Sequence, residues 1–327
     1  MRLQRFTRVL AAAGVLAGAL LSTTTPVPAA QVATRADAAA CFPFETLAPA
    51  LRARAETMLL RALDGEALYS IATDIKPMSS GVASARVRVD DPDLADAEEL
   101  RQILRVWTCG GEISAHLHHF AAVYDGARPL EAMVVNHAAL RRVLDERAAF
   151  FGRYGLSSSS DPMEVMMAVE YDRTSARFRG YGLLFGYPDH AVDFFVEAAD
   201  TQAETGAFVE RDFISLPTIR GTNYFVYAVP KGHVTVDEDR QLRERAEPVF
   251  TDYQARRTRH IRGDSAEGVL DLVREWFDNG TGDVRPSNVW KARGGSWSAF
   301  QDSPMERRGF SPCGAPGCEG RSLETRS

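Results

Sequence analysis

Residues 111–136 read GEISAHLHHFAAVYDGARPLEAMVVN, and this stretch decides the predicted fold. Two largely apolar runs flank Asp125-Gly126, a dipeptide that favours the tight turn of a β-hairpin. The first run predicts a strand that extends to Tyr124, and the second predicts a strand over 130–135. A helix is the alternative for the first run, because Glu112, His116 and His119 would then share one face.

The rest of the chain alternates between further strands and helices, without an internal repeat. Strands are predicted over 84–89, 208–216 and 224–229. Helices are predicted over 47–62, 91–107, 136–151, 177–185, 192–199, 235–253 and 265–277, and a further helix is predicted to start at Asp161-Pro162. About five strands with helices between them predict an α+β domain built on an antiparallel sheet, with helices packed on one face.

The N-terminus has the three parts of a secretory signal. Arg2, Arg5 and Arg8 precede an apolar and glycine run over 9–21, and small residues end at Ala29. Because a membrane-spanning helix needs about 20 apolar residues, this run is too short to be a retained anchor. We therefore expect a bacterial Sec-type signal peptide over 1–29, with the destination open between periplasm, cell surface and medium.

Composition divides the remaining chain and limits its partners. We expect a flexible spacer over 30–40, a single main α+β domain over 41–278 and a loop-rich extension over 279–327. Without residues 1–29 the chain has 35 basic and 44 acidic residues, a formal net charge of −9. An acidic surface argues against nucleic acid as a partner. No second apolar stretch approaches the length of a membrane span.

Four cysteines remain after the signal. An even count in an exported chain predicts two disulfides, and three pairings are open. We favour Cys41–Cys109 and Cys313–Cys318, the second across a short turn-forming loop. The alternative is a metal site built from the four thiolates, although Cys41 and Cys109 have no near partner in the sequence.

The densest group of candidate ligands is His116-Leu117-His118-His119. On a strand, His116 and His118 point to the same face, and two imidazoles at that spacing can bind one metal ion. His137 or Glu112 would supply a third ligand. The other interpretation of these histidines is a solvated polar face of the sheet.

A second candidate is Lys76, which lies shortly before Ser79 in the segment Lys76-Pro77-Met78-Ser79. Burial can lower the pKa of a lysine into a useful range, so Lys76 could act as the base for a nucleophilic Ser79. Turn formation by the proline, serines and glycine explains the same segment equally well.

These observations favour an exported protein with a binding or interaction role, whose small-molecule or protein partner the sequence does not name. The alternative function is a secreted metal-dependent hydrolase centred on His116 and His118. Apart from a divalent metal such as zinc, no cofactor is expected, because no phosphate-binding loop pattern is present. Whether the protein is an enzyme is left open by the sequence.

Overall fold

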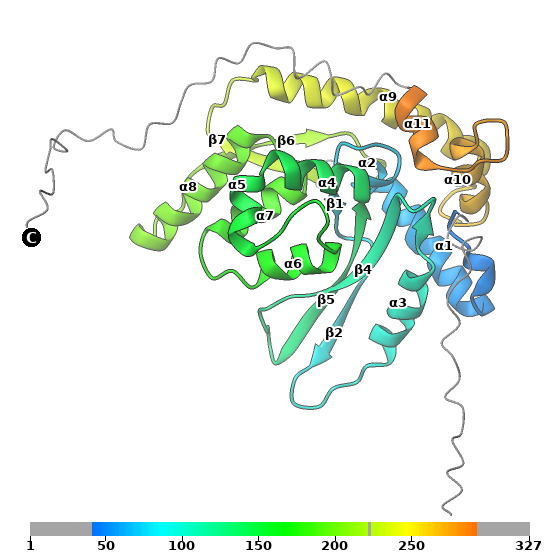
Figure 1. Ribbon diagram of the computed structural model, residues 1–327, viewed down its shortest axis with the longest axis horizontal. Helices are drawn as coiled ribbons and strands as arrows, with labels where there is room; N and C mark the ends of the chain where they lie inside the picture. The colour runs from blue at the N-terminus through cyan, green and yellow to red at the C-terminus, as the bar shows by residue number, and fades with distance from the viewer. Residues whose placement is uncertain (1–40, 222–223, 293–327) are drawn as a thin grey trace, which may run out of the picture.

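The computed structural model describes residues 41–221 and 224–292, which form one compact α+β body (Figure 1). An antiparallel sheet, which the sequence predicts, lies at its centre; it has five strands, and three of them are strands that the sequence predicts. Its strands are β1 (Met78–Ser79), β2 (Ser84–Arg88), β3 (Thr108–Cys109), β4 (Ile113–His119) and β5 (Ala127–Asn136). The longest strand, β5, pairs with β1 and β2 on one side and with β4 on the other, and β3 pairs with β4.

The β4–β5 hairpin confirms the strand interpretation, although β4 ends at His119 and not at Tyr124 as predicted. Its register pairs His116 with Met133 and His118 with Glu131. Asp125 and Gly126 both have positive φ angles, 50° and 72°, which the tight hairpin turn requires and which Asp-Gly tolerates. His116 and His118 therefore share one face of the sheet.

Helices cover both faces of the sheet, so the expectation of helices on one face is wrong. Val134 packs into a core shared with α1 (Pro49–Asp64), α3 (Ala95–Arg105) and α10 (Val269–Phe277). Val135 faces the opposite way, into a core shared with α4 (His137–Glu146), α6 (Pro162–Glu170) and α7 (Ala176–Leu184). Successive side chains of a strand alternate between faces, and both of these valines are fully buried.

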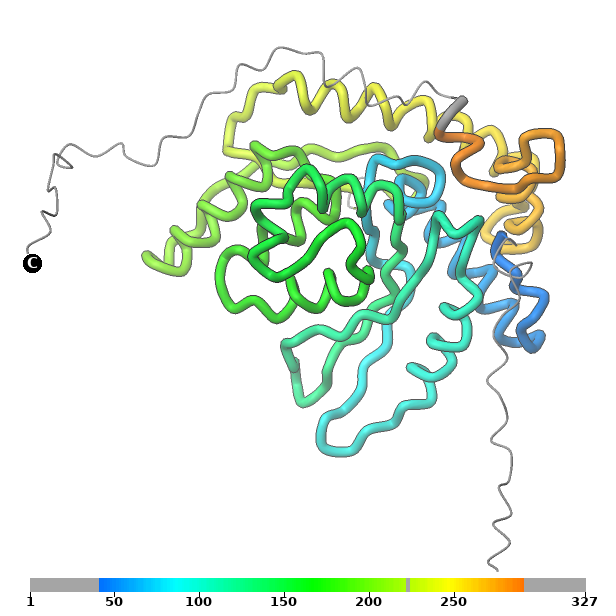
Figure 2. The backbone as a smooth tube through the Cα atoms, in the orientation of Figure 1, coloured from blue at the N-terminus to red at the C-terminus, as the bar shows by residue number. Residues whose placement is uncertain are grey.

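The strands predicted near 208–216 and 224–229 form a separate sheet. They are β6 (Arg211–Leu216) and β7 (Phe225–Pro230), which pair antiparallel with each other. Helix α8 (Asp189–Thr205) packs against β7. The long helix α9 (Asp237–His260) runs along the molecule above the β6–β7 pair (Figure 2). The remaining helical segments are α2 (Leu68–Ile71), α5 (Ala148–Phe151), α11 (Pro286–Ala292) and two short 3-10 turns, Phe44–Thr46 and Gly152–Tyr154.

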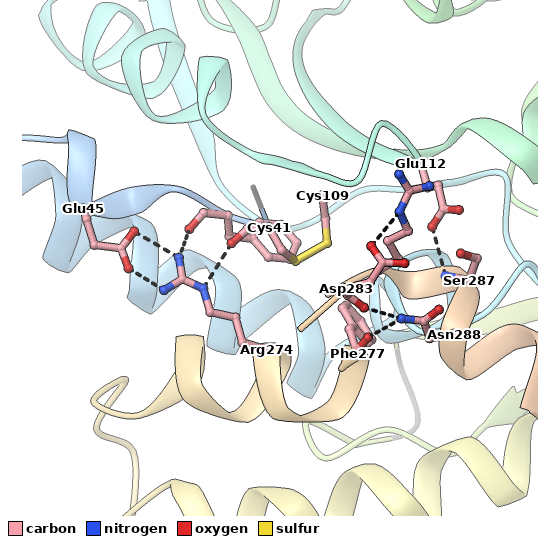
Figure 3. Close-up of a disulfide and its surroundings, with 11 residues drawn as sticks. Cys41, Glu45, Cys109, Glu112, Arg274, Phe277, Asp283, Ser287 and Asn288 are labelled. Carbon is pink, nitrogen blue, oxygen red and sulfur yellow. Dashed lines mark hydrogen bonds and ion pairs between the residues drawn. A yellow bond between two sulfur atoms is a disulfide. The ribbon is translucent and has the colours of Figure 1, made fainter. Parts of the chain in front are cut away.

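The disulfide Cys41–Cys109 is present, which confirms that predicted pairing. It joins the start of the described chain to β3, and Arg274 of α10 reinforces the junction (Figure 3). The guanidinium of Arg274 donates to the main-chain oxygens of Cys41 and Phe42 and to the carboxylate of Glu45. The N-terminal segment is therefore fixed to two distant parts of the fold.

Several expectations fall on the margins of the described chain. Helix α11 lies within 279–327, the stretch expected to be loop-rich, and its Val289 is buried in the same core as α10. The predicted signal over 1–29, the spacer over 30–40, and Cys313 and Cys318 lie outside the described residues. Within the described ranges, no helix has both the length and the apolar character needed to cross a membrane.

Candidate metal centre

The four residues predicted as metal ligands do not converge on one point. His116 and His137 approach each other through Ser114, whose hydroxyl lies 2.8 Å from the Nε2 atom of each ring. Glu112 turns away, and its carboxylate accepts a hydrogen bond from the main-chain N–H of Ser287 at 2.9 Å (Figure 3). The predicted set is therefore divided between separate environments.

His118 belongs to a buried polar network instead. Its Nε2 atom lies 3.0 Å from the hydroxyl of Tyr181, which in turn donates to Glu170. Glu170 also accepts hydrogen bonds from Arg177 and from the main-chain N–H of Ala121. Burial lowers the pKa of His118 to about 4, although the nearby Glu170 opposes the shift. The ring is a neutral member of the core at physiological pH.

Lys76 and Ser79 are both fully buried, but they are not a base and its nucleophile. The Lys76 ammonium binds Oε2 of Glu66 at 2.8 Å and lies 4.2 Å from the centre of the Phe225 ring. The Ser79 hydroxyl instead contacts Ser70 Oγ at 2.7 Å. Burial lowers the pKa of Lys76, and the contact with Glu66 opposes that shift. This arrangement links segments inside the core.

A different set of side chains forms the candidate metal centre: His190, His233 and Asp239. Their ligand atoms all lie within 4.8 Å of one another, and among the described residues they form the sole group of three or more histidine, cysteine or acidic side chains gathered this closely. His190 is in the first turn of α8, His233 lies in the connection after β7, and Asp239 is in the first turn of α9. The site thus joins three elements.

Asp239 is held in place by the local chain. Its carboxylate accepts from the main-chain N–H of Val236 at 3.0 Å, which caps the N-terminus of α9. The Tyr227 hydroxyl donates to the other oxygen at 2.7 Å. Burial raises the pKa of Asp239, but the hydrogen bonds from His233, Tyr227 and Val236 outweigh it and lower the pKa overall. The carboxylate is therefore a fixed anion.

The geometry around His190 fits a metal ligand better than a hydrogen-bonded ring. Both ring nitrogens are buried and neither makes a hydrogen bond among the described residues, although carboxylate oxygens lie close to each. Nε2 is 3.2 Å from Oδ1 of Asp239, and Nδ1 is 3.4 Å from Oε2 of Glu238. The 3.2 Å between Nε2 of His190 and Oδ1 of Asp239 is close to the separation of roughly 3.3 Å between two ligand atoms of a tetrahedral zinc ion, each of which lies 2.0–2.1 Å from the ion.

The remaining contacts agree with this assignment. His233 Nε2 lies 2.8 Å from Oδ2 of Asp239, a hydrogen-bond distance, so an ion bound there would replace the proton that now joins them. The rings of His190 and His233 lie nearly parallel, with centres 5.2 Å apart. Glu238 beside Nδ1 of His190 is placed as the outer carboxylate that commonly orients a zinc-bound histidine.

A cavity of about 440 Å³ adjoins this site. Its lining includes Asp189 and Glu238, the chain neighbours of the ligands His190 and Asp239. Arg142, Arg147 and Arg245 also line it, and each of them binds an aspartate. Three protein ligands would leave a coordination position of a tetrahedral ion open; His190, His233 and Asp239 are not themselves among the residues that line the cavity.

Sequence reasoning missed this group because its members are widely separated. His190 and His233 are 43 positions apart, and each is a single histidine in an otherwise ordinary helix start or turn. The acidic first turn of α9 was visible in the sequence, but as a helix-capping signal.

Comparisons with protein-family models, with curated proteins and with solved structures find no match to this chain.

Proposed function

We propose that this chain is an exported protein that binds one divalent transition-metal ion, zinc by preference, through His190, His233 and Asp239. The observation that carries the proposal is His190, whose two buried nitrogens face carboxylates without making a hydrogen bond. Two imidazoles and one carboxylate form a donor set that suits zinc. Export is supported by the disulfide Cys41–Cys109, since such bonds persist in oxidising compartments.

A metal-dependent hydrolase is the second candidate function, and the cavity beside the site favours it. A zinc ion with three protein ligands has room for a water molecule, whose pKa the ion lowers to about 7. Turnover of bis(p-nitrophenyl) phosphate that chelation abolishes and zinc restores would support this function, whereas turnover unchanged by chelation would contradict it.

Titration calorimetry with zinc chloride tests the binding proposal. We expect one ion per wild-type chain, binding weakened at least 100-fold or so in His190→Gln and His233→Gln, and about tenfold weaker binding in Glu238→Gln. His260→Gln is the matched control, because His260 also contacts a carboxylate, that of Glu275 at 2.5 Å, and lies at the other end of α9.

His190→Gln is the decisive variant. The ring makes no hydrogen bond among the described residues and packs on the rings of Tyr227 and His233, so we expect its replacement to leave the protein folded, and the thermal unfolding curve of the metal-free variant checks this. Equal zinc affinity in wild type and His190→Gln would overturn the assignment of the site. A wild-type protein that binds no zinc would overturn the proposal itself.

A further inference from the structure

Ser114 lies between two imidazoles on the face of the sheet that carries α6. Its Oγ atom is 2.8 Å from Nε2 of His116, two positions along β4, and 2.8 Å from Nε2 of His137, at the start of α4. All three side chains are half-buried, so they are in contact with solvent as well as with one another. The triplet joins a hydroxyl to two potential bases.

The single hydroxyl proton of Ser114 gives the two rings different roles. A serine hydroxyl has one proton, so it donates to one ring nitrogen and accepts from the other. Burial lowers the pKa of both His116 and His137, which favours the neutral form of each ring. The Nε2 atom of one ring then accepts the serine proton with its lone pair, and the Nε2 of the other ring is protonated and donates to Oγ. Asp161 opposes that shift at both rings, so it also favours an imidazolium once a proton has been taken up.

A cavity of about 360 Å³ begins at this triplet. Ser114 and His116 are among its lining residues, whereas His137 is not. His116 is therefore the ring placed to pass a proton to a bound molecule, and His137 is placed to donate to Oγ and orient it. Arg101 and Arg105 of α3 also line the cavity; Arg101 is paired with Glu98, and Arg105 gives the cavity positive charge.

The edge of β4 adds a main-chain donor to the same cavity. The N–H of Phe120 donates to Pro129 of β5, so by strand alternation the N–H groups of Ala115 and Leu117 point away from β5. Both residues line the cavity, and because β3 pairs with positions 113 and 114 of β4, the N–H of Leu117 lies beyond that pairing. An N–H group in this position is suited to stabilise a developing oxyanion.

We propose that Ser114 is a nucleophile for acyl transfer with His116 as its general base, and that the cavity binds an ester bearing a carboxylate or phosphate group. Oγ attacks the ester carbonyl while its proton moves to Nε2 of His116. The bond to the leaving alcohol then breaks, and the imidazolium returns the proton to that oxygen. Water, activated by the same ring, hydrolyses the acyl-serine and restores the hydroxyl. The site is separate from the candidate metal centre and does not rest on its function.

Labelling with diisopropyl fluorophosphate in the presence of a chelator, read by peptide mass spectrometry, tests the nucleophile. We expect one adduct, on Ser114, that Ser114→Ala abolishes and that His116→Gln slows about 100-fold or more. Ser84→Ala, on the exposed strand β2, is the matched serine control and should label normally. The chelator keeps the result independent of any metal site.

His137 is a positioning residue, and paired variants distinguish this role from simple packing. His137→Gln keeps an N–H donor for Oγ and should label at nearly the wild-type rate, whereas His137→Leu should label about tenfold more slowly. Equal rates for the two variants would remove His137 from the site. An unlabelled wild-type protein, or an adduct that persists in Ser114→Ala, would overturn the nucleophile.

The substrate class has its own test, with p-nitrophenyl acetate and the mono-p-nitrophenyl ester of succinate as probes. We expect kcat/KM to be about tenfold higher for the anionic ester in the wild type, and we expect Arg105→Gln to remove most of that preference. Labelling of Ser114 without a preference for the anionic ester would keep the nucleophile and overturn the assigned substrate.

Discussion

At the scale of single residues, burial makes His118 part of the core. His118 is fully buried against Tyr181, Glu170 and the Phe120 ring, with a pKa near 4. An unfolded chain returns this pKa to about 6.5. Between these two values the unfolded state binds more protons than the folded state, so protonation drives unfolding.

The stability contributed by neutral His118 is therefore fully present above about pH 6.5 and is lost as the pH falls toward 4. We expect its share of the slope to reach about 1.4 kcal/mol per pH unit. Urea unfolding of wild type and His118→Gln at several pH values measures this share as the difference between the two curves. Parallel curves over this range would contradict the assignment.

Lys76 gives a second prediction at this scale. Removing one partner of a buried ion pair leaves the other charge uncompensated, at a cost of about 3–5 kcal/mol. Lys76→Met should therefore destabilise the protein by this amount, because it removes the partner of the buried Glu66 carboxylate. The double variant Lys76→Met with Glu66→Gln should recover part of the loss in urea unfolding. A double variant that is less stable than Lys76→Met would refute this account.

At the scale of elements, two glycines allow α7 to lie close to its neighbours. A Cβ atom added at Gly180 would lie 2.8 Å from Val169 of α6, and one added at Gly182 would lie 2.7 Å from Val192 of α8. Glycine inside a helix costs about 1 kcal/mol relative to alanine. Glycine at these two positions therefore lowers the helix propensity of α7 but allows close packing between the helices.

Gly182→Ala should lower the free energy of unfolding by about 1–3 kcal/mol, because overpacking outweighs the gain in helix propensity. Val192→Ala alone should also destabilise, since it removes buried methyl groups. The double variant should be more stable than the sum of the two single effects predicts. Purely additive effects in chemical denaturation would show that the contact with Val192 is not the cause.

At the scale of the whole molecule, the disulfide Cys41–Cys109 closes a loop with a sequence separation of 68. Together with Arg274, it ties the N-terminal segment to β3 and α10 (Figure 3). On the chain-entropy model, a loop of this length stabilises the fold by about 4 kcal/mol. On this model the bond stabilises the fold mainly by restricting the unfolded chain.

Replacing both Cys41 and Cys109 by serine should lower the free energy of unfolding by about 4 kcal/mol. The same loss should follow when the wild type is unfolded in reducing buffer, whereas the double variant should not respond to reductant. A double variant as stable as the oxidised wild type would mean that the native contacts of Arg274 suffice to hold the segment.

The sequence by itself determined the local features of this protein. Alternation and the Asp125-Gly126 turn predicted the β4–β5 hairpin and the shared face of His116 and His118, because strand geometry depends on neighbouring residues alone. It also predicted an α+β fold with an antiparallel sheet. The pairing of Cys41 with Cys109 was favoured from the count and spacing of cysteines, and the structure confirms it.

Only the tertiary structure decided which chemical groups meet. It brought His190, His233 and Asp239 together by packing α8 against the end of β7 and the start of α9. It placed His137 beside Ser114 because β5 carries the chain back along β4. It also covered both faces of the sheet, where the sequence predicted one. Such contacts depend on how whole elements pack, and the spacing of residues along the chain carries no signal of that packing.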